Sequence, residues 1–198
     1  MFNPNFIEIY DNTLTSYQCK EVIRWTETQS LTRGRCAGDN NETVVNLKVK
    51  DSWDIFGKFS KKNYVDLLIK DVLNKYTPFY LEKYPSVNLM ESWDVDDDYN
   101  IQKYDPCGGY HVLHHENEGG MDIMRVMAWM IYLNTVTDKG GTYFSYYNKT
   151  IKAKEGRLVI WPAYFTHTHK GVVSKTQTKY IATGWHSYSS DPMTAQNW

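Results

Sequence analysis

The sequence GYHVLHHENEGG, residues 109–120, is the stretch that decides the fold. It places His114 and Glu116 two residues apart. Residues i and i+2 of a β-strand point to the same face, so this imidazole and this carboxylate can reach one cation. A third ligand from a distant strand would complete a set of two histidines and one carboxylate. Such a set leaves coordination positions open and favours non-haem Fe(II).

A second histidine cluster lies further along the chain, in FTHTHKG, residues 165–171. Either His167 or His169 of this cluster can supply the third ligand. A His-x-Glu pair alone is a weak signal, because most such pairs are polar surface residues, and a His-x-His pair is often structural or a zinc site. The other histidines, His111, His115 and His186, are expected to neighbour the site or to face solvent, without a metal role.

The hydrophobic pattern around both clusters changes at about residue 90 from a period of 3.6 to a period of two. Alternation with a period of two is typical of half-buried strands. Turn signals such as Asp96-Asp97-Asp98 separate the segments, and many short strands at this spacing favour a β-sandwich or barrel. The expected strands are residues 90–95, 99–104, 109–115, 125–134, 142–147, 157–161, 166–173 and 179–187.

The N-terminal part mixes strand and helix signals. Residues 6–10 alternate apolar and polar side chains, which predicts a strand. Thr15 and Gln18 form a capping box, which predicts a helix that continues to about Thr28.

Two further segments complete this part of the chain. Residues 31–46 are rich in Gly and Asn, which is typical of a loop. Apolar residues at a spacing of four predict a second helix over residues 61–80, with Ser60 as its N-cap. The predicted fold class is α+β, mainly β. We expect one domain over 1–198, made of an N-terminal strand and supporting helices (1–89), a β core (90–188) and a tail (189–198).

Composition excludes several function classes. The 198 residues carry a net charge of −1, without a long run of one sign, so we expect neither nucleic-acid nor membrane binding. Three scattered cysteines do not suggest a disulfide framework or a cysteine-based zinc site. The first residues do not resemble a signal peptide, and the apolar stretches are short for a membrane span, so the expected location is cytoplasmic.

The order of motifs around the two histidine clusters carries a family resemblance. QKYDPCGGY precedes the first cluster; RVMAWMIYLN, KGGTYF and LVIWP lie between the clusters, and KYIATGW follows the second. This order resembles the prolyl-4-hydroxylase-like branch of the Fe(II)- and 2-oxoglutarate-dependent oxygenases, over about residues 90–188. The resemblance implies a double-stranded β-helix (jelly-roll, cupin-like) core with N-terminal flanking helices.

The resemblance also implies roles for individual residues. His114 and Glu116 correspond to the proximal Fe(II) ligands, although the family usually has Asp at the position of Glu116. Lys179 corresponds to the basic residue that pairs with the far carboxylate of 2-oxoglutarate. Tyr132 corresponds to a tyrosine that hydrogen-bonds the same carboxylate, and Tyr104 to another tyrosine near the cosubstrate.

The distal iron ligand has two candidates. The spacing from Trp161-Pro162 favours His167, whereas the spacing to Lys179 favours His169. We prefer His169, because the stretch after the ligand varies less in the family than the turn before it. We expect both histidines to point the same way on a strand, so that the other one lines the same cavity.

The expected function is hydroxylation of an organic substrate by a dioxygenase that decarboxylates 2-oxoglutarate to succinate and CO2. Its partners would be O2 and a peptide, with a prolyl or other side chain, or a small molecule; ascorbate is a candidate accessory reductant. Two alternatives remain open: a non-catalytic jelly-roll binding protein, and a cupin-like metal enzyme that does not use 2-oxoglutarate. The sequence does not identify the substrate or the oligomeric state.

Overall fold

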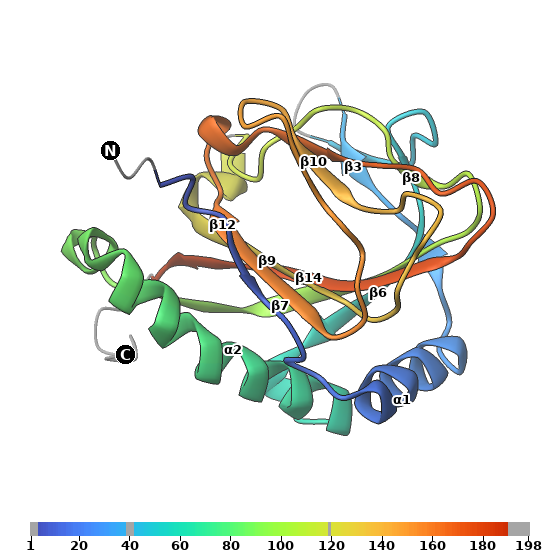
Figure 1. The fold of residues 1–198 in the computed structure, drawn as a ribbon, viewed down its shortest axis with the longest axis horizontal. Helices are drawn as coiled ribbons and strands as arrows, with labels where there is room; N and C mark the ends of the chain where they lie inside the picture. Colours follow the sequence, from blue (N-terminus) through green and yellow to red (C-terminus); the bar gives the residue numbers. More distant parts are fainter. Residues whose placement is uncertain (1–3, 39–41, 119, 190–198) are drawn as a thin grey trace.

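A seven-stranded antiparallel sheet forms the centre of the computed structural model, which describes residues 4–38, 42–118 and 120–189 (Figure 1). Its strand order is β1-β12-β9-β14-β7-β6-β2. In this order the strands are β1 (Glu8–Tyr10), β12 (Arg157–Pro162), β9 (Arg125–Tyr132), β14 (Lys179–Tyr188), β7 (Trp93–Tyr104), β6 (Trp53–Lys58) and β2 (Thr32–Arg33).

A second layer of short strands lies across one face of this main sheet (Figure 1). It holds a three-stranded sheet in the order β11-β10-β13 and two small pairs, β3 with β4 and β5 with β8. Their bounds are β11 (Lys149–Ile151), β10 (Thr142–Phe144), β13 (His169–Gly171), β3 (Cys36–Ala37), β4 (Thr43–Val44), β5 (Lys50–Asp51) and β8 (Gly109–Tyr110). Two layers of antiparallel strands confirm the predicted mainly-β, jelly-roll class.

Two helices cover the opposite face of the main sheet (Figure 1). Helix α1 (Ser16–Glu27) begins with the predicted capping box of Thr15 and Gln18. Helix α2 (Tyr64–Lys83) is capped by Asn63 and not, as predicted, by Ser60. Ser60 lies in a preceding 3-10 turn, where its backbone N–H and hydroxyl both donate to the Asp97 carboxylate.

The alternation of side chains along the main sheet divides the core in two. Ile101, Trp129 and Ile131 face the helices, and they are fully buried there. Met130 and Tyr132, their neighbours in β9, face the second layer. Because β9 is covered on both faces, its sequence is apolar from Val126 to Tyr132.

The structure corrects the predicted turn at Asp96-Asp97-Asp98, because these residues lie within the single strand β7. Each carboxylate has a partner that suits an extended chain. Asp96 accepts from the Ser187 hydroxyl at 2.9 Å, Asp97 accepts from Ser60, and Asp98 pairs with Lys58 at 2.8 Å.

Other elements also differ from the sequence prediction. The segment 31–46, expected to be loop, contributes β2, β3 and β4, and the strands β5, β6 and β11 were not predicted. The predicted strand 109–115 is reduced to β8, and 166–173 to β13, which follows a 3-10 turn (Phe165–His167). None of the described helices is long and apolar enough to cross a membrane. The predicted tail, 189–198, lies outside the described residues beyond Ser189.

Candidate metal centre and cosubstrate cavity

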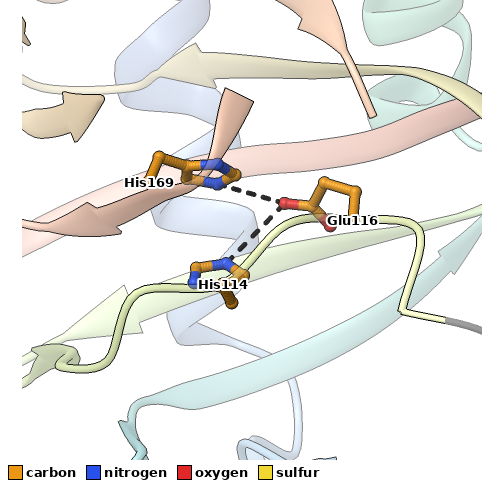
Figure 2. A group of neighbouring side chains, drawn as sticks. All are labelled: His114, Glu116 and His169. Carbon is orange, nitrogen blue, oxygen red and sulfur yellow. Dashed lines mark ion pairs between the residues drawn. The ribbon is translucent and has the colours of Figure 1, made fainter. Parts of the chain in front are cut away.

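Three side chains from the two histidine clusters converge between the layers: His114, Glu116 and His169 (Figure 2). One ligand atom from each lies within 4.8 Å of the others. Glu116 Oε1 is 3.2 Å from His169 Nε2 and 3.8 Å from His114 Nε2. Two imidazoles and one carboxylate therefore share one side of a site that a divalent cation can occupy.

The backbone brings the two histidines together through an isolated β-bridge. The His114 N–H donates to the His169 carbonyl at 3.0 Å, and the His169 N–H donates to the His114 carbonyl at 2.8 Å. Glu116 is fixed separately, because its N–H donates to the Ala163 carbonyl at 2.9 Å. The predicted proximity of His114 and Glu116 is present, but in an irregular segment and not in a continuous strand.

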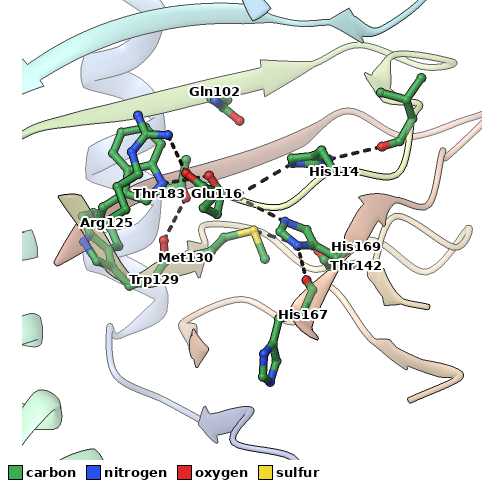
Figure 3. A network of polar contacts seen from close by, with 12 residues as sticks. Gln102, His114, Glu116, Arg125, Trp129, Met130, Thr142, His167, His169 and Thr183 are labelled. Atoms are coloured by element: carbon green, nitrogen blue, oxygen red, sulfur yellow. Dashed lines mark hydrogen bonds and ion pairs between the residues drawn. The ribbon is translucent and has the colours of Figure 1, made fainter. Parts of the chain in front are cut away.

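Both histidines are oriented by hydrogen bonds at Nδ1 (Figure 3). His114 Nδ1 lies 3.2 Å from the Val112 carbonyl, and His169 Nδ1 lies 2.8 Å from the His167 carbonyl. A carbonyl only accepts, so each Nδ1 carries a proton and each Nε2 is the nitrogen that faces the shared centre. Burial, together with the neighbouring His169, lowers the pKa of His114 to about 4, so this ring is neutral at physiological pH.

The second oxygen of Glu116 is held by Trp185. Glu116 Oε2 accepts from Trp185 Nε1–H at 2.7 Å. The guanidinium of Arg125 stacks over the Trp185 ring at 3.6 Å. It also donates to the Glu116 carbonyl at 3.0 Å (Figure 3). Arg125 also pairs with Asp122 at 2.8 Å. These contacts fix the longer glutamate side chain so that Oε1 faces the histidines.

A cavity of about 670 Å³ extends from the three converging side chains. Its floor is the inner face of the main sheet, where Tyr104 lies opposite Lys179 and Thr183 lies opposite both Asn100 and Met130. The volume is typical of a site for a small organic ligand. The cavity wall also contains the buried ion pair of Lys50 and Asp54, with atoms 2.6 Å apart, and Asn100, whose Oδ1 is buried without a hydrogen-bond partner.

Lys179 is a second buried cation of this cavity, and unlike Lys50 it is not paired with a described carboxylate. It is 7% exposed, and its Nζ lies 4.6 Å from the centre of the Tyr104 ring. Among the described residues its ammonium makes no ion pair, and burial lowers its pKa from 10.5 to about 8. A buried charge without a partner is costly. The cavity is therefore suited to an anionic ligand that pairs with Lys179.

The two predicted tyrosines occupy different positions. Tyr104 lines the cavity, and its hydroxyl donates to Gln102 Oε1 at 2.6 Å. Tyr132 is fully buried behind Thr142, with 2.7 Å between their hydroxyl oxygens. Thr142, the first residue of the expected strand 142–147, lines the cavity itself. Tyr132 thus orients a cavity-lining hydroxyl in this structure.

His167 does not point where the sequence predicted. It ends the 3-10 turn before β13, so its ring is directed away from His169 (Figure 3). Its Nε2 lies 2.8 Å from the Asn5 carbonyl, and it does not line the cavity. The expectation that both histidines point the same way on a strand is wrong, because the chain turns between them.

Two other histidines, His115 and His186, lie in different parts of the fold. His115 lines the cavity. His186 is fully buried on the helix side of the main sheet, with its Nε2 3.1 Å from the Thr77 hydroxyl of α2. The expectation of a neighbour of the site or a solvent-facing ring is therefore wrong for His186. Its neighbour Trp185 points to the opposite face, and sequence reasoning missed its contact with Glu116.

Comparisons with known proteins agree with this geometry. Residues 99–187 match the model of the 2OG-Fe(II) oxygenase superfamily. No curated protein sequence matches the chain. Among solved structures, the viral collagen prolyl hydroxylase of Paramecium bursaria Chlorella virus-1, in complex with 2-oxoglutarate, is similar with a TM-score of 0.69 and 18% identity. The match covers 93% of this chain and 97% of the viral protein.

Two further prolyl hydroxylases share the fold. The Pseudomonas putida prolyl-4-hydroxylase matches with a TM-score of 0.67 and 11% identity, over 93% of this chain and 94% of that one. A Trichoplax adhaerens prolyl hydroxylase, in complex with a peptide fragment of a hypoxia-inducible factor, matches with a TM-score of 0.69 and 15% identity, over 98% and 89%.

The fold defined by these layers is that of the prolyl hydroxylases, and the predicted resemblance is confirmed. Within this fold, residues 99–187 match the model of the 2OG-Fe(II) oxygenase superfamily.

Proposed function

We propose that the chain is an Fe(II)- and 2-oxoglutarate-dependent hydroxylase in which His114, Glu116 and His169 hold the iron. One nitrogen from each of the two imidazoles and one carboxylate oxygen converge within 4.8 Å. This donor set fits Fe(II) and leaves coordination positions open on the cavity side.

The observation that supports 2-oxoglutarate as the cosubstrate is the burial of the Lys179 ammonium. An ammonium that is buried without a carboxylate partner, in the same cavity as the three ligands, fits the far carboxylate of 2-oxoglutarate. Tyr104 flanks this ammonium, and we propose that Thr142, oriented by Tyr132, hydrogen-bonds the same carboxylate. Such an arrangement would fix one end of the cosubstrate while its other end reaches the metal.

When bound together, Fe(II) and 2-oxoglutarate supply the O2-dependent chemistry that couples decarboxylation to succinate and CO2 with hydroxylation of a substrate. The chain supplies geometry and charge. Trp185 and Arg125 hold Glu116, the Val112 and His167 carbonyls hold the two imidazoles, and Lys179 balances the charge of the cosubstrate.

The substrate class is inferred from the outer part of the cavity. Beyond the metal centre the cavity reaches the β3–β4 hairpin, where Arg35, Glu42, Thr43 and the 61% exposed Phe56 line an open groove. An open, mixed polar and apolar groove suits a side chain presented on a peptide. We therefore propose a peptidyl substrate, in line with the peptide bound by the Trichoplax protein. Ascorbate remains a prediction from the sequence.

The test is 2-oxoglutarate turnover without added substrate. Wild-type protein supplied with Fe(II), O2 and 2-oxoglutarate should slowly form succinate, and a panel of peptides should be screened for stimulation. The Lys179→Ala variant should lose most of this turnover at low 2-oxoglutarate. A cupin-like metal enzyme that does not use 2-oxoglutarate would form no succinate even as the wild type. Iron-dependent succinate formation that is unchanged in Lys179→Ala would refute the role of this residue.

A further inference from the structure

The segment at residues 4–7, here called the N-terminal strap, is hydrogen-bonded to the rest of the fold at two successive residues, Asn5 and Phe6. The Asn5 carbonyl lies 2.8 Å from His167 Nε2. The Phe6 carbonyl accepts from the Tyr80 hydroxyl at 3.0 Å, and the Ile7 N–H donates to Asn5 Oδ1 at 3.1 Å. Phe6 has a φ of 54°, a conformation that non-glycine residues adopt only when their surroundings enforce it.

The ring of His167 has one hydrogen-bonding arrangement that satisfies both nitrogens. Nε2 must carry the proton, because its partner at Asn5 is a carbonyl. Nδ1 can then accept from the Thr166 hydroxyl, which lies 3.0 Å away. The ring is only 2% exposed, and the Tyr147 hydroxyl lies 3.3 Å from Nε2. With both nitrogens engaged, the ring has no free lone pair for a metal.

The backbone of the same residue contacts the metal centre. The His167 carbonyl accepts from His169 Nδ1–H at 2.8 Å. This hydrogen bond fixes the tautomer of His169 and the direction of its Nε2 lone pair. Partners of this kind, one step behind a metal ligand, typically change metal affinity by about 10- to 100-fold when they are lost.

We propose that His167 is a positioning residue. Its ring holds the N-terminal strap through the Asn5 carbonyl, and its own carbonyl orients the His169 ring so that Nε2 faces the metal. Residues at the start of the chain therefore contribute to the iron site although none of them lies in it. This inference rests on the proposed function, since it assumes that His169 ligates Fe(II).

The experiment compares three variants of the full chain by titration with Co(II), as a stable probe for Fe(II), under conditions where circular dichroism shows each to be folded. In His167→Gln the side-chain amide can replace Nε2–H and donate to the Asn5 carbonyl. In His167→Asn the amide is too short to reach it, and in His167→Leu the donor is lost. We expect His167→Gln to keep wild-type affinity within about threefold, and the other two to lose about 10- to 100-fold.

Because His167 lies two residues before the proposed ligand His169, a variant at a distant residue provides an independent test. Tyr80→Phe frees the Phe6 carbonyl without touching the second histidine cluster, and it should weaken Co(II) binding non-additively with His167→Asn. Tyr180→Phe, which deletes a tyrosine hydrogen bond to Glu27 elsewhere, is the matched control and should have no effect.

Two results would overturn the inference: wild-type affinity in folded His167→Asn and His167→Leu, or equal losses in His167→Gln and His167→Asn. If His167→Leu does not fold, the Gln and Asn pair decides alone. Failure of the proposed function is a different result, because wild-type protein would then bind neither Co(II) nor Fe(II) with 2-oxoglutarate.

Discussion

Trp185 donates its indole N–H to Glu116 at 2.7 Å and so leaves a single carboxylate oxygen facing the two histidines. The related oxygenases usually carry aspartate at this position, so a glutamate raises the question of how its extra methylene is accommodated. In this structure the hydrogen bond from Trp185 holds the longer Glu116 side chain in place. Arg125, stacked on the indole and bonded to the Glu116 carbonyl, fixes the anchor itself.

Removing this anchor should weaken the metal site. In Trp185→Phe the ring remains but the donor is lost, so the carboxylate can rotate and present either oxygen. We expect Fe(II) affinity to fall by about tenfold, measured by anaerobic titration. An unchanged affinity would mean that Trp185 packs beside Glu116 without orienting it.

Replacing the glutamate by the family's usual residue should not improve this protein. The shorter carboxylate of Glu116→Asp cannot reach both the metal position and Trp185. We expect weaker Fe(II) binding in Glu116→Asp, and little additional loss when Trp185→Phe is combined with it, because the two changes break the same contact. Additive losses in this double-mutant cycle would contradict the coupling.

The affinity for 2-oxoglutarate should depend on pH through Lys179. Burial lowers the pKa of this ammonium to about 8 in the free protein, and only its protonated form pairs with a carboxylate. The dissociation constant for 2-oxoglutarate should therefore rise above pH 8, approaching tenfold for each pH unit. Calorimetric titration from pH 7 to 9 measures this, with Co(II) bound. Lys179→Arg stays charged and should show a flat profile; a parallel rise in both proteins would exclude Lys179 as the cause.

Burial of the Lys179 ammonium should also lower the free energy of unfolding of the wild type. Lys179→Met removes a buried charge without a partner, and we expect its free energy of unfolding to rise by on the order of 1–3 kcal/mol while 2-oxoglutarate binding is lost. The wild type should become more stable between about pH 8 and 10.5, because over this range the unfolded chain holds a proton that the folded chain has released. Urea denaturation at several pH values tests both statements, and the second effect should be absent in Lys179→Met.

Local sequence signals predicted much of the scaffold. The capping box of Thr15 and Gln18 begins α1 as expected, because it depends on residues three apart. The segments 125–134, 157–161 and 179–187 were expected to be strands, and they form β9, β12 and β14. The aspartates of β7 misled the prediction, because their partners Ser60, Lys58 and Ser187 are distant in sequence.

The sequence predicted the three residues of the candidate metal site, but it did not predict the contacts that surround them. His114, Glu116 and His169 came from two short motifs and from a family resemblance. The role of Trp185 depends on the pairing of β14 with β9, and the direction of His167 on a 3-10 turn, neither of which leaves a pattern in the local sequence. Tertiary contacts of this kind decide which of the two histidines turns toward His114 and Glu116.

The central claim is that His114, Glu116 and His169 hold Fe(II) beside a 2-oxoglutarate that Lys179 anchors. Anaerobic titration of the wild type with Fe(II) and 2-oxoglutarate tests it most directly, through the weak visible charge-transfer band of the chelate. We predict this band in the wild type and in His167→Gln, its loss in His169→Ala, and a need for far more 2-oxoglutarate in Lys179→Ala. A folded wild type without the band, or a band that persists unchanged in His169→Ala, would contradict the account.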